Sequence, residues 1–220
     1  MIGAGGLGSP VTLYLASAGV GRITLCDGDT VDLTNLQRQI VHRTESIGRM
    51  KVESARATLH AINPHAEVIA IGERVDADRI AELAARSDIV LDGSDNFATR
   101  HAVNRACVRH RKPLVSGAAV RFDGQVAVFD LRDAEAPCYA CLFPDEGEHE
   151  EVRCAVMGVF APITGIVGTI QAAEALKVLA GVGDTLAGRL LLIDALTMQL
   201  RTIRFRKDAA CAVCGTRTGV

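Results

Sequence analysis

The chain has 220 residues, 49% of them hydrophobic, and a formal net charge of −2 at neutral pH. This length and hydrophobic content are sufficient for a globular domain with a full core, and they exclude a disordered chain. The near-neutral charge, with basic residues scattered along the sequence, gives no electrostatic footprint for nucleic acid, so we expect no nucleic-acid partner.

A glycine-rich string opens the chain. Residues 3–8 read Gly-Ala-Gly-Gly-Leu-Gly, the G-x-G-x-x-G pattern of a phosphate-binding loop between a strand and a helix. The first glycine permits the tight turn, the central pair lets backbone N–H groups approach phosphate oxygens, and the last allows close helix packing. A helix over residues 9–18 then directs its positive N-terminus at the anion. We therefore expect a nucleotide, rather than a purely structural turn, at Gly3, Gly5, Gly6 and Gly8.

Only Met1 and Ile2 precede this loop, where such a fold places its first strand. We expect two residues to be too few to pair along a parallel sheet, so either the first strand is truncated or the loop is loosely held. The next apolar run, residues 22–27, ends at Asp27. This aspartate lies 19 residues after Gly8, close to the spacing of about 20 that is typical of a carboxylate bound to ribose hydroxyls. These features alone predict a mononucleotide or dinucleotide fold, with NAD among the candidate ligands.

Strand and helix signals alternate as far as residue 118. Apolar runs predict strands, and periodic segments between them predict helices, one of which carries Val52, Ala55, Leu59 and Ile62 on one face. The strands are expected at 22–27, 67–71, 88–92 and 113–117, and the helices near 49–62, 77–86 and 97–111. This alternation predicts an α/β protein with a Rossmann-like, doubly wound and mainly parallel sheet.

The pattern changes after residue 118. Strand-like runs at 125–130, 190–194 and 200–205 have less helix between them, which predicts antiparallel strands that extend the sheet. The acidic run at 145–151 is expected to be a solvated mobile loop.

Residues 156–173 form an uncharged run long enough to raise the question of a membrane helix. Glycines and Pro162 dilute this run, and Glu174 and Lys177 continue the same helix. We therefore expect a buried helix that starts at Pro162, and no membrane partner. The start of the chain has no secretory pattern, so we expect a cytoplasmic protein.

Four of the seven cysteines form two C-x-x-C pairs, Cys138/Cys141 and Cys211/Cys214. Each pair offers two thiolates from a tight turn, and two pairs complete the tetrahedral sulfur shell that zinc prefers. We predict a structural Zn²⁺ in a knuckle of four cysteines, with reduced cysteines or a redox pair as the alternatives.

The other cysteines and the histidines give weaker signals. Cys26 and Cys107 are expected to be buried apolar residues. Cys154 follows the acidic run, where flexible backbone would expose it, and is a candidate reactive thiol. The six histidines show no ligand or catalytic spacing, so we treat them as structural.

Polar residues follow the predicted strands. Asn35 and Arg38 come after the first strand, Lys51 begins the next helix, and Asp95 follows the strand at 88–92. Ligands of doubly wound sheets bind outside the carboxyl ends of the strands, so these residues should meet the glycine loop and Asp27. A triphosphate requires such cations and a metal-binding carboxylate, whereas a dehydrogenase does not. The alternatives are solvated charges at Arg38 and Lys51, and a helix N-cap at Asp95.

With these motifs in this order, the sequence resembles the ThiF/MoeB/HesA family, bacterial relatives of ubiquitin-activating enzymes. The matching motifs run from residue 2 to about residue 215. They are Gly-Ala-Gly-Gly-Leu-Gly-Ser at 3–9, Leu-Cys-Asp at 25–27, Asn-Leu-Gln-Arg-Gln at 35–39, Lys-Val-Glu-Ser-Ala-Arg at 51–56, Asp-Asn at 95–96, Val-Ser-Gly-Ala-Ala at 115–119, Cys-Tyr-Ala-Cys-Leu-Phe-Pro at 138–144 and Cys-Ala-Val-Cys-Gly at 211–215.

The resemblance implies adenylation of the C-terminal glycine of a small ubiquitin-like sulfur carrier protein that ends in Gly-Gly. ATP and Mg²⁺ are used and pyrophosphate is released, in molybdenum-cofactor, thiamine or related sulfur transfer. The resemblance assigns Arg38 and Lys51 to the phosphates, Asp95 to Mg²⁺ and Asp27 to the ribose. It also assigns further nucleotide contacts to Asn35, Gln37 and Asn96.

The resemblance also implies a homodimer and one adenylation domain over 1–220. Within this domain we expect a nucleotide-binding half at 1–118 and a carrier-binding and zinc half at 119–215. Family members carry a longer first strand and preceding helices, with an arginine that reaches a partner subunit's ATP and has no counterpart in this sequence. A catalytically impaired carrier-binding or scaffold homologue is therefore the alternative function, and an NAD-dependent dehydrogenase is a more distant one.

Overall fold

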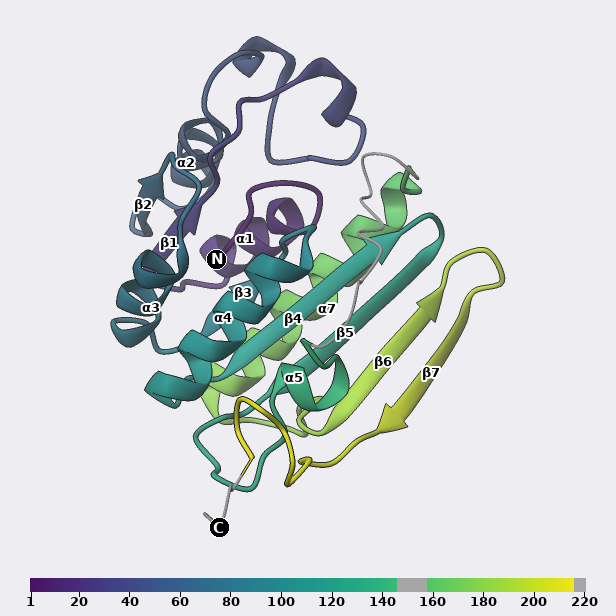
Figure 1. Cartoon of the computed structure of the whole chain (residues 1–220). Coiled ribbons are helices and arrows are strands. Elements are labelled where there is room, and N and C mark those ends of the chain that lie inside the picture. Colours follow the sequence, from purple (N-terminus) through teal and green to yellow (C-terminus); the bar gives the residue numbers. More distant parts are fainter. Residues whose placement is uncertain (146–157, 216–220) are drawn as a thin grey trace.

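The computed structural model describes residues 1–145 and 158–215 (Figure 1). Each predicted helix and strand is present, close to its predicted ends. The helices are α1 (Gly8–Ser17), α2 (Lys51–Ile62), α3 (Ala77–Ala85), α4 (Phe97–His110), α5 (Tyr139–Leu142) and α7 (Ala161–Ala180). The strands are β1 (Arg22–Cys26), β2 (Glu67–Ile71), β3 (Val90–Asp92), β4 (Leu114–Val120), β5 (Asp123–Phe129), β6 (Arg189–Asp194) and β7 (Gln199–Arg204). Two short 3₁₀ turns, η1 (Leu33–Asn35) and η2 (Thr44–Ser46), lie between β1 and α2.

The strands build a mixed sheet. Strand β1 pairs in parallel with β2, and β3 pairs in parallel with β4. Strands β5, β6 and β7 follow β4 in this order, each antiparallel to the strand before it. The parallel part and its antiparallel extension are therefore as predicted from the sequence.

The prediction that Met1 and Ile2 are too few to pair in the sheet is wrong. Ile2 forms parallel bridges to both β1 and β3, and so joins the two parts of the sheet. Its N–H donates to the Leu91 carbonyl (2.9 Å), the N–H of Gly3 donates to the Cys26 carbonyl (2.8 Å), and the N–H of Cys26 donates to the Met1 carbonyl (3.0 Å). A neighbouring strand on each side supplies these partners, so two residues are enough to seat the start of the glycine loop.

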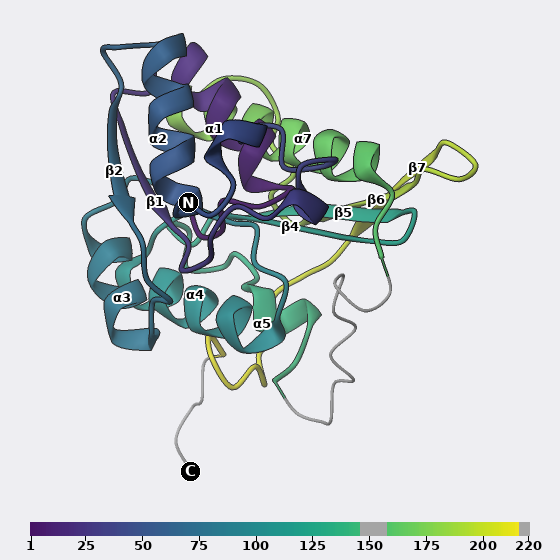
Figure 2. The same cartoon turned by 90° about the horizontal axis from the view of Figure 1, so that it is seen from above.

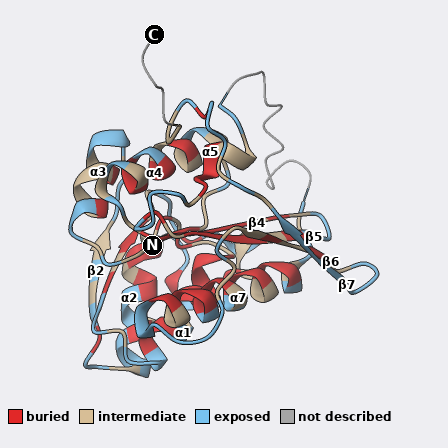
Figure 3. Ribbon diagram, turned by 90° about the horizontal axis from the view of Figure 1, so that it is seen from below, coloured by how far each residue is buried: buried red, intermediate tan, exposed pale blue. Residues whose placement is uncertain are grey.

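Helices cover both faces of the sheet (Figure 2). Helices α1, α2 and α7 lie on one face, and α3, α4 and α5 lie on the other. The buried sides of the helices are turned toward the strands (Figure 3). One apolar cluster includes Leu15, Val52 and Val167 beneath the first set of helices, and a second includes Val103 and Phe129 beneath the other. The predicted doubly wound architecture is thus confirmed.

Helix α7 corresponds to the uncharged run of the sequence. By length and composition it could cross a membrane, but half of its most apolar 18-residue stretch is buried inside the protein. The helix packs against α1, β4 and β5. The prediction of a buried core helix is confirmed.

Some sequence predictions differ from the structure or lie outside it. Ile62, at the end of α2, is 44% exposed, whereas the other three residues predicted for the apolar face of this helix are buried. The acidic run lies outside the described residues except for Asp145, whose carboxylate pairs with Arg105 (2.9 Å). Cys154 also lies outside the described residues, so its predicted reactivity stays a prediction.

Candidate functional site

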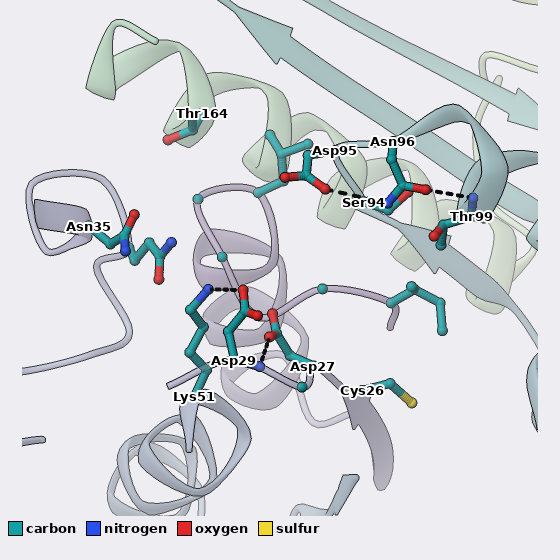
Figure 4. Close-up of a pocket in the computed structure, with 18 of the residues that line it drawn as sticks. Cys26, Asp27, Asp29, Asn35, Lys51, Ser94, Asp95, Asn96, Thr99 and Thr164 are labelled. Carbon is teal, nitrogen blue, oxygen red and sulfur yellow. Dashed lines mark hydrogen bonds and ion pairs between the residues drawn. The ribbon is translucent and has the colours of Figure 1, made fainter. Parts of the chain in front are cut away.

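A cavity of about 700 Å³ lies where the glycine loop and the carboxyl ends of β1 and β3 meet. Its volume is within the usual range for small-molecule sites. Asp27, Asp29 and Lys51 lie together on one side, apart from Asp95 and Asn96 (Figure 4). The sequence-predicted residues that line the cavity are Gly3, Gly5, Gly6, Asp27, Asn35, Arg38, Lys51, Asp95 and Asn96.

The glycine loop is held by backbone geometry and by side chains from other segments. Gly3 has φ +94°, a conformation that residues with a Cβ rarely adopt. A Cβ on Gly8 would come 2.0 Å from the Gly3 carbonyl oxygen, so Gly8, the first residue of α1, lets the loop close. The N–H of Ala4 donates to Asp27 Oδ2 (2.8 Å), and the Ala4 carbonyl is 2.9 Å from His42 Nε2. These contacts fix the position of the loop.

Asp27 has a structural role in addition to the ribose contact that was predicted for it. One carboxylate oxygen accepts from Ala4, and the other accepts from the N–H of Asp29 (2.9 Å). The side chain therefore ties the end of β1 to the glycine loop while it lines the cavity. Its contact with a ribose stays a prediction.

Lys51 forms an ion pair at the cavity wall. Its Nζ lies 3.0 Å from Asp29 Oδ2, and its side chain is only 8% exposed. The hydrogen bond from Lys51, with a smaller contribution from Arg74, lowers the pKa of Asp29 below its ordinary value. Asp29 thus balances the charge of a nearly buried cation. Asp29 was not predicted from the sequence, although it lies two residues after Asp27, the carboxylate that follows β1.

The segment between β1 and α2 contributes Asn35, Arg38 and Gln39. Arg38 donates from Nη2 to Asn35 Oδ1 (2.7 Å), so both side chains are held at the cavity. Gln37, which the sequence analysis assigned to the nucleotide, is exposed and does not line the cavity. Gln39 lines it instead, is 4% exposed, and its Oε1 has no hydrogen-bond partner among the described residues. A buried amide oxygen without a partner is costly, which makes Gln39 a candidate ligand contact.

Asp95 and Asn96 lie between β3 and α4. The N-cap of α4 is Asn96, which accepts from the N–H of Thr99 (2.8 Å), so the alternative role of Asp95 as that N-cap is excluded. Asp95 is exposed and lines the cavity, with its carboxylate available to a cation. Arg100, one turn into α4, donates to the Ser94 carbonyl (3.0 Å) and steadies the same turn.

The four cysteines of the C-x-x-C pairs form a second site, away from the cavity. Their sulfur atoms all lie within 4.8 Å of one another. The Cys138–Cys211 distance is 3.8 Å, Cys138–Cys141 is 4.0 Å and Cys141–Cys214 is 3.4 Å. Zinc–sulfur bonds of about 2.3 Å in a tetrahedron place sulfur atoms about 3.8 Å apart. The predicted four-cysteine cluster is therefore confirmed, and its geometry fits a tetrahedral metal ion.

The remaining described cysteines are outside this cluster. Cys26 and Cys107 are free and buried, as predicted. Burial raises the pKa of both thiols, so neither is a ready nucleophile at neutral pH.

The fold and the cavity define a class: a doubly wound α/β protein with a glycine-rich loop at its cavity and a cluster of four cysteines that could hold a metal ion. A model of the ThiF family matches residues 1–213, and the chain belongs to this family.

Several curated relatives of the chain are named adenylyltransferases. The chain is 46% identical over 215 residues to molybdopterin-synthase adenylyltransferase of Escherichia coli (strain K12), covering 98% of this chain and 86% of the relative. It is 47% identical over 219 residues to the sulfur carrier protein adenylyltransferase of Thermus thermophilus, covering 98% and 81%. It is 44% identical over 215 residues to the sulfur carrier protein ThiS adenylyltransferase of Escherichia coli, covering 98% and 84%.

The solved structure of Escherichia coli MccB with ATP has the same fold. The TM-score is 0.84 at 24% sequence identity, and the match covers 97% of this chain and 65% of the MccB chain. At this identity the likeness shows the fold alone.

Proposed function

We propose that this protein adenylates the C-terminal carboxylate of a small ubiquitin-like sulfur carrier protein, consuming ATP and releasing pyrophosphate. The observation that carries the proposal is one cavity lined by the glycine loop, by the cations Arg38 and Lys51, and by the carboxylate of Asp95. The adenylyltransferases that share 44–47% of the sequence support this reaction class. Their names include both molybdopterin-synthase and ThiS enzymes, so the carrier is proposed at the level of this class.

The reaction requires charge compensation rather than proton transfer. The attacking carboxylate is already ionised at neutral pH, so it needs no general base. One of its oxygens bonds to the α-phosphorus of ATP, and the bond from that phosphorus to the bridging oxygen of the β-phosphate breaks. The electron pair leaves with pyrophosphate. An anion must approach a polyanion, so cations aimed at the phosphates should supply most of the rate enhancement.

The cavity residues fit this requirement. We assign Arg38 and Lys51 to the phosphates and Asp27 to the ribose hydroxyls. Asp95 would hold Mg²⁺, a cation that neutralises phosphate charge when bound. The glycine loop would bind phosphate oxygens through its N–H groups and the positive end of α1.

Neighbouring amides complete the proposed nucleotide site. Asn35 orients Arg38 through its side-chain oxygen. Asn96 holds the turn that carries Asp95. We assign Gln39 in place of Gln37, since the unpartnered oxygen of Gln39 can accept a hydrogen bond from a nucleotide hydroxyl or amino group.

We propose Zn²⁺ at the four cysteines because the sulfur spacing fits its tetrahedral shell. All four positions are then taken by protein, so this ion would stabilise the fold and would not touch the reactants.

We also propose that the protein is a homodimer in the cytoplasm. We propose that its carrier ends in Gly-Gly, a thin tail that would pass the glycines of the cavity.

Replacing Lys51 tests the proposal. Removal of one preorganised charge typically lowers the rate by about 10²–10³-fold, so Lys51→Ala should reduce carrier-dependent ATP–pyrophosphate exchange by that order. The variant should still fold, because Asp29 has a half-exposed side chain that water can solvate. Lys112→Ala, which removes a lysine outside the cavity, is the matched control and should exchange at the wild-type rate.

Three results would contradict the proposal. Near-normal exchange by Lys51→Ala, with metal still bound, would remove Lys51 from the catalytic groups. ATP binding by the wild-type protein without exchange in the presence of a carrier would favour the scaffold alternative, and nicotinamide binding without exchange would favour a dehydrogenase.

A further inference from the structure

A hydrogen bond reaches the four-cysteine cluster from helix α4. Asn104 of α4 is fully buried, and its Nδ2 lies 3.5 Å from the sulfur of Cys138, which is also fully buried. The Oδ1 of the same amide accepts from the N–H of Tyr139 (2.9 Å). An N–H group can only donate, so this second bond fixes the amide orientation and turns its NH₂ group toward sulfur.

The charge of a four-thiolate metal site explains why this contact matters. Four thiolates around one divalent cation carry a net charge of −2, which is costly in a buried position unless donors compensate it. Cys141 receives such a donor from the backbone, because the N–H of Asp208 lies 3.5 Å from its sulfur. Cys138 is shielded from water, so its compensation has to come from protein. Asn104 is placed to provide it.

Asn104 also fixes the shape of the knuckle. Cys138 is the N-cap residue of α5 and makes no side-chain cap hydrogen bond. The N–H of Tyr139, at the start of α5, is satisfied by Asn104 instead. One side chain of α4 therefore holds both the sulfur of the first C-x-x-C pair and the backbone next to it.

We propose that Asn104 is a positioning residue of the metal site, which holds Cys138 as a thiolate ligand and sets how firmly the cluster retains its metal. Loss of outer-shell partners of this kind typically lowers metal affinity about 10–100-fold. The inference concerns metal retention, so a failure of the exchange assay described above would leave it standing.

The test compares three variants for Zn²⁺ affinity by competition with a chromogenic chelator. Asn104→Asp keeps an oxygen for the Tyr139 N–H but replaces the donor to sulfur with an acceptor, and Asn104→Ala removes both bonds. Each should bind Zn²⁺ about 10–100-fold more weakly than the wild type. Val103→Ala is the matched control, since Val103 is a buried neighbour on α4 without a bond to sulfur, and it should keep the wild-type affinity.

A spectroscopic measurement separates a bond to sulfur from a general loss of stability. In the Co²⁺-substituted protein, removal of a donor from a thiolate should move the sulfur-to-cobalt charge-transfer band to lower energy. We expect this shift in both Asn104 variants and no shift in Val103→Ala. An unchanged band and an affinity within about twofold of wild type in the Asn104 variants would overturn the proposal. Equal losses of affinity in Asn104→Ala and Val103→Ala with no band shift would do the same.

Discussion

At the scale of single residues, His42 has a defined protonation state. Its Nε2 faces the Ala4 carbonyl, which can only accept, so this nitrogen carries the proton. Its Nδ1, 3.0 Å from the Ser54 hydroxyl, is then an acceptor in the neutral ring. Burial lowers the pKa of His42 below its ordinary value, and this effect outweighs the hydrogen bond to the Ala4 carbonyl, which acts in the opposite direction. The glycine loop is therefore held by a neutral histidine.

Because His42 is neutral and buried, we expect the free energy of unfolding to depend on pH. Between its folded-state pKa and about 6.5, His42 binds more protons in the unfolded chain than in the folded protein. The free energy of unfolding should therefore fall as the pH decreases through this window and should be fully retained above it. Urea unfolding at pH 7.5 and pH 5.5 measures the difference in the wild type and in His42→Gln.

The glutamine variant cannot titrate, so it should lose less stability than the wild type between these two pH values. The exposed His60 provides the control, since His60→Gln should lose as much as the wild type. Equal losses in His42→Gln and in the wild type would show that another group controls this transition.

The sequence predicted some cavity residues and missed others. Asp27 and Asp95 follow strands, and Lys51 begins a helix, so their places follow from the fold class. The segment between β1 and α2 has only short 3₁₀ turns, without a regular period that would assign side chains to the cavity or to solvent. The choice of Gln37 over Gln39 and the omission of Asp29 both come from this irregular geometry.

At the scale of elements, α7 crosses α1 at Gly168. A Cβ at this position would lie 2.5 Å from the Leu7 carbonyl oxygen and 2.5 Å from Pro10 Cγ. Leu7 belongs to the glycine loop, and Pro10 lies in the first turn of α1. The missing side chain therefore lets α7 support the loop directly.

Two glycine substitutions in α7 should have opposite effects. Gly168→Ala should lower the free energy of unfolding by about 1–3 kcal/mol, the usual cost of overpacking, and should weaken ATP binding because the backbone of Leu7 must shift. Gly165→Ala is the matched control, because a Cβ there has no neighbour within 4 Å in the described structure. It should raise the free energy of unfolding by about 0.5–1 kcal/mol, since alanine favours a helix. Urea titration and ATP titration of the variants would check both effects, and equal stability would refute the tight crossing.

The elements themselves were predictable because apolar runs and helical periods recur along the chain. The pairing of Met1 and Ile2 was not predictable from the length of the segment. Pairing depends on the two strands that flank Ile2, β1 and β3, and these come together only in the folded sheet.

At the scale of the whole molecule, one sheet links the cavity with the cysteine cluster. Strand β4 crosses residue 118, the predicted boundary between the two halves of the domain. It pairs with both β3 and β5, so the hydrogen bonds of one sheet continue from the first half into the second. Helix α4 has its N-cap, Asn96, at the cavity and carries Asn104 near the cysteines. The division into nucleotide-binding and carrier-binding halves stays a prediction about function.

Some features of this arrangement were predictable from the sequence, and others were not. The alternation of strands and helices determines which strand ends meet at the cavity. The two C-x-x-C pairs are about 70 residues apart, and their spacing within each pair predicted that they would meet. The bond from Asn104 to Cys138 has no such signal, because it depends on how α4 packs against α5.

The most direct test of the central claim is the intact mass of a carrier protein after incubation with this chain. Purified carrier ending in Gly-Gly is mixed with ATP, Mg²⁺ and either wild-type protein or Lys51→Ala. The wild type should convert the carrier to a species heavier by one adenylyl group and release pyrophosphate, and a carrier lacking its last glycine should stay unmodified. An unchanged mass for the intact carrier, with ATP bound to the wild-type chain, would contradict the proposed adenylation.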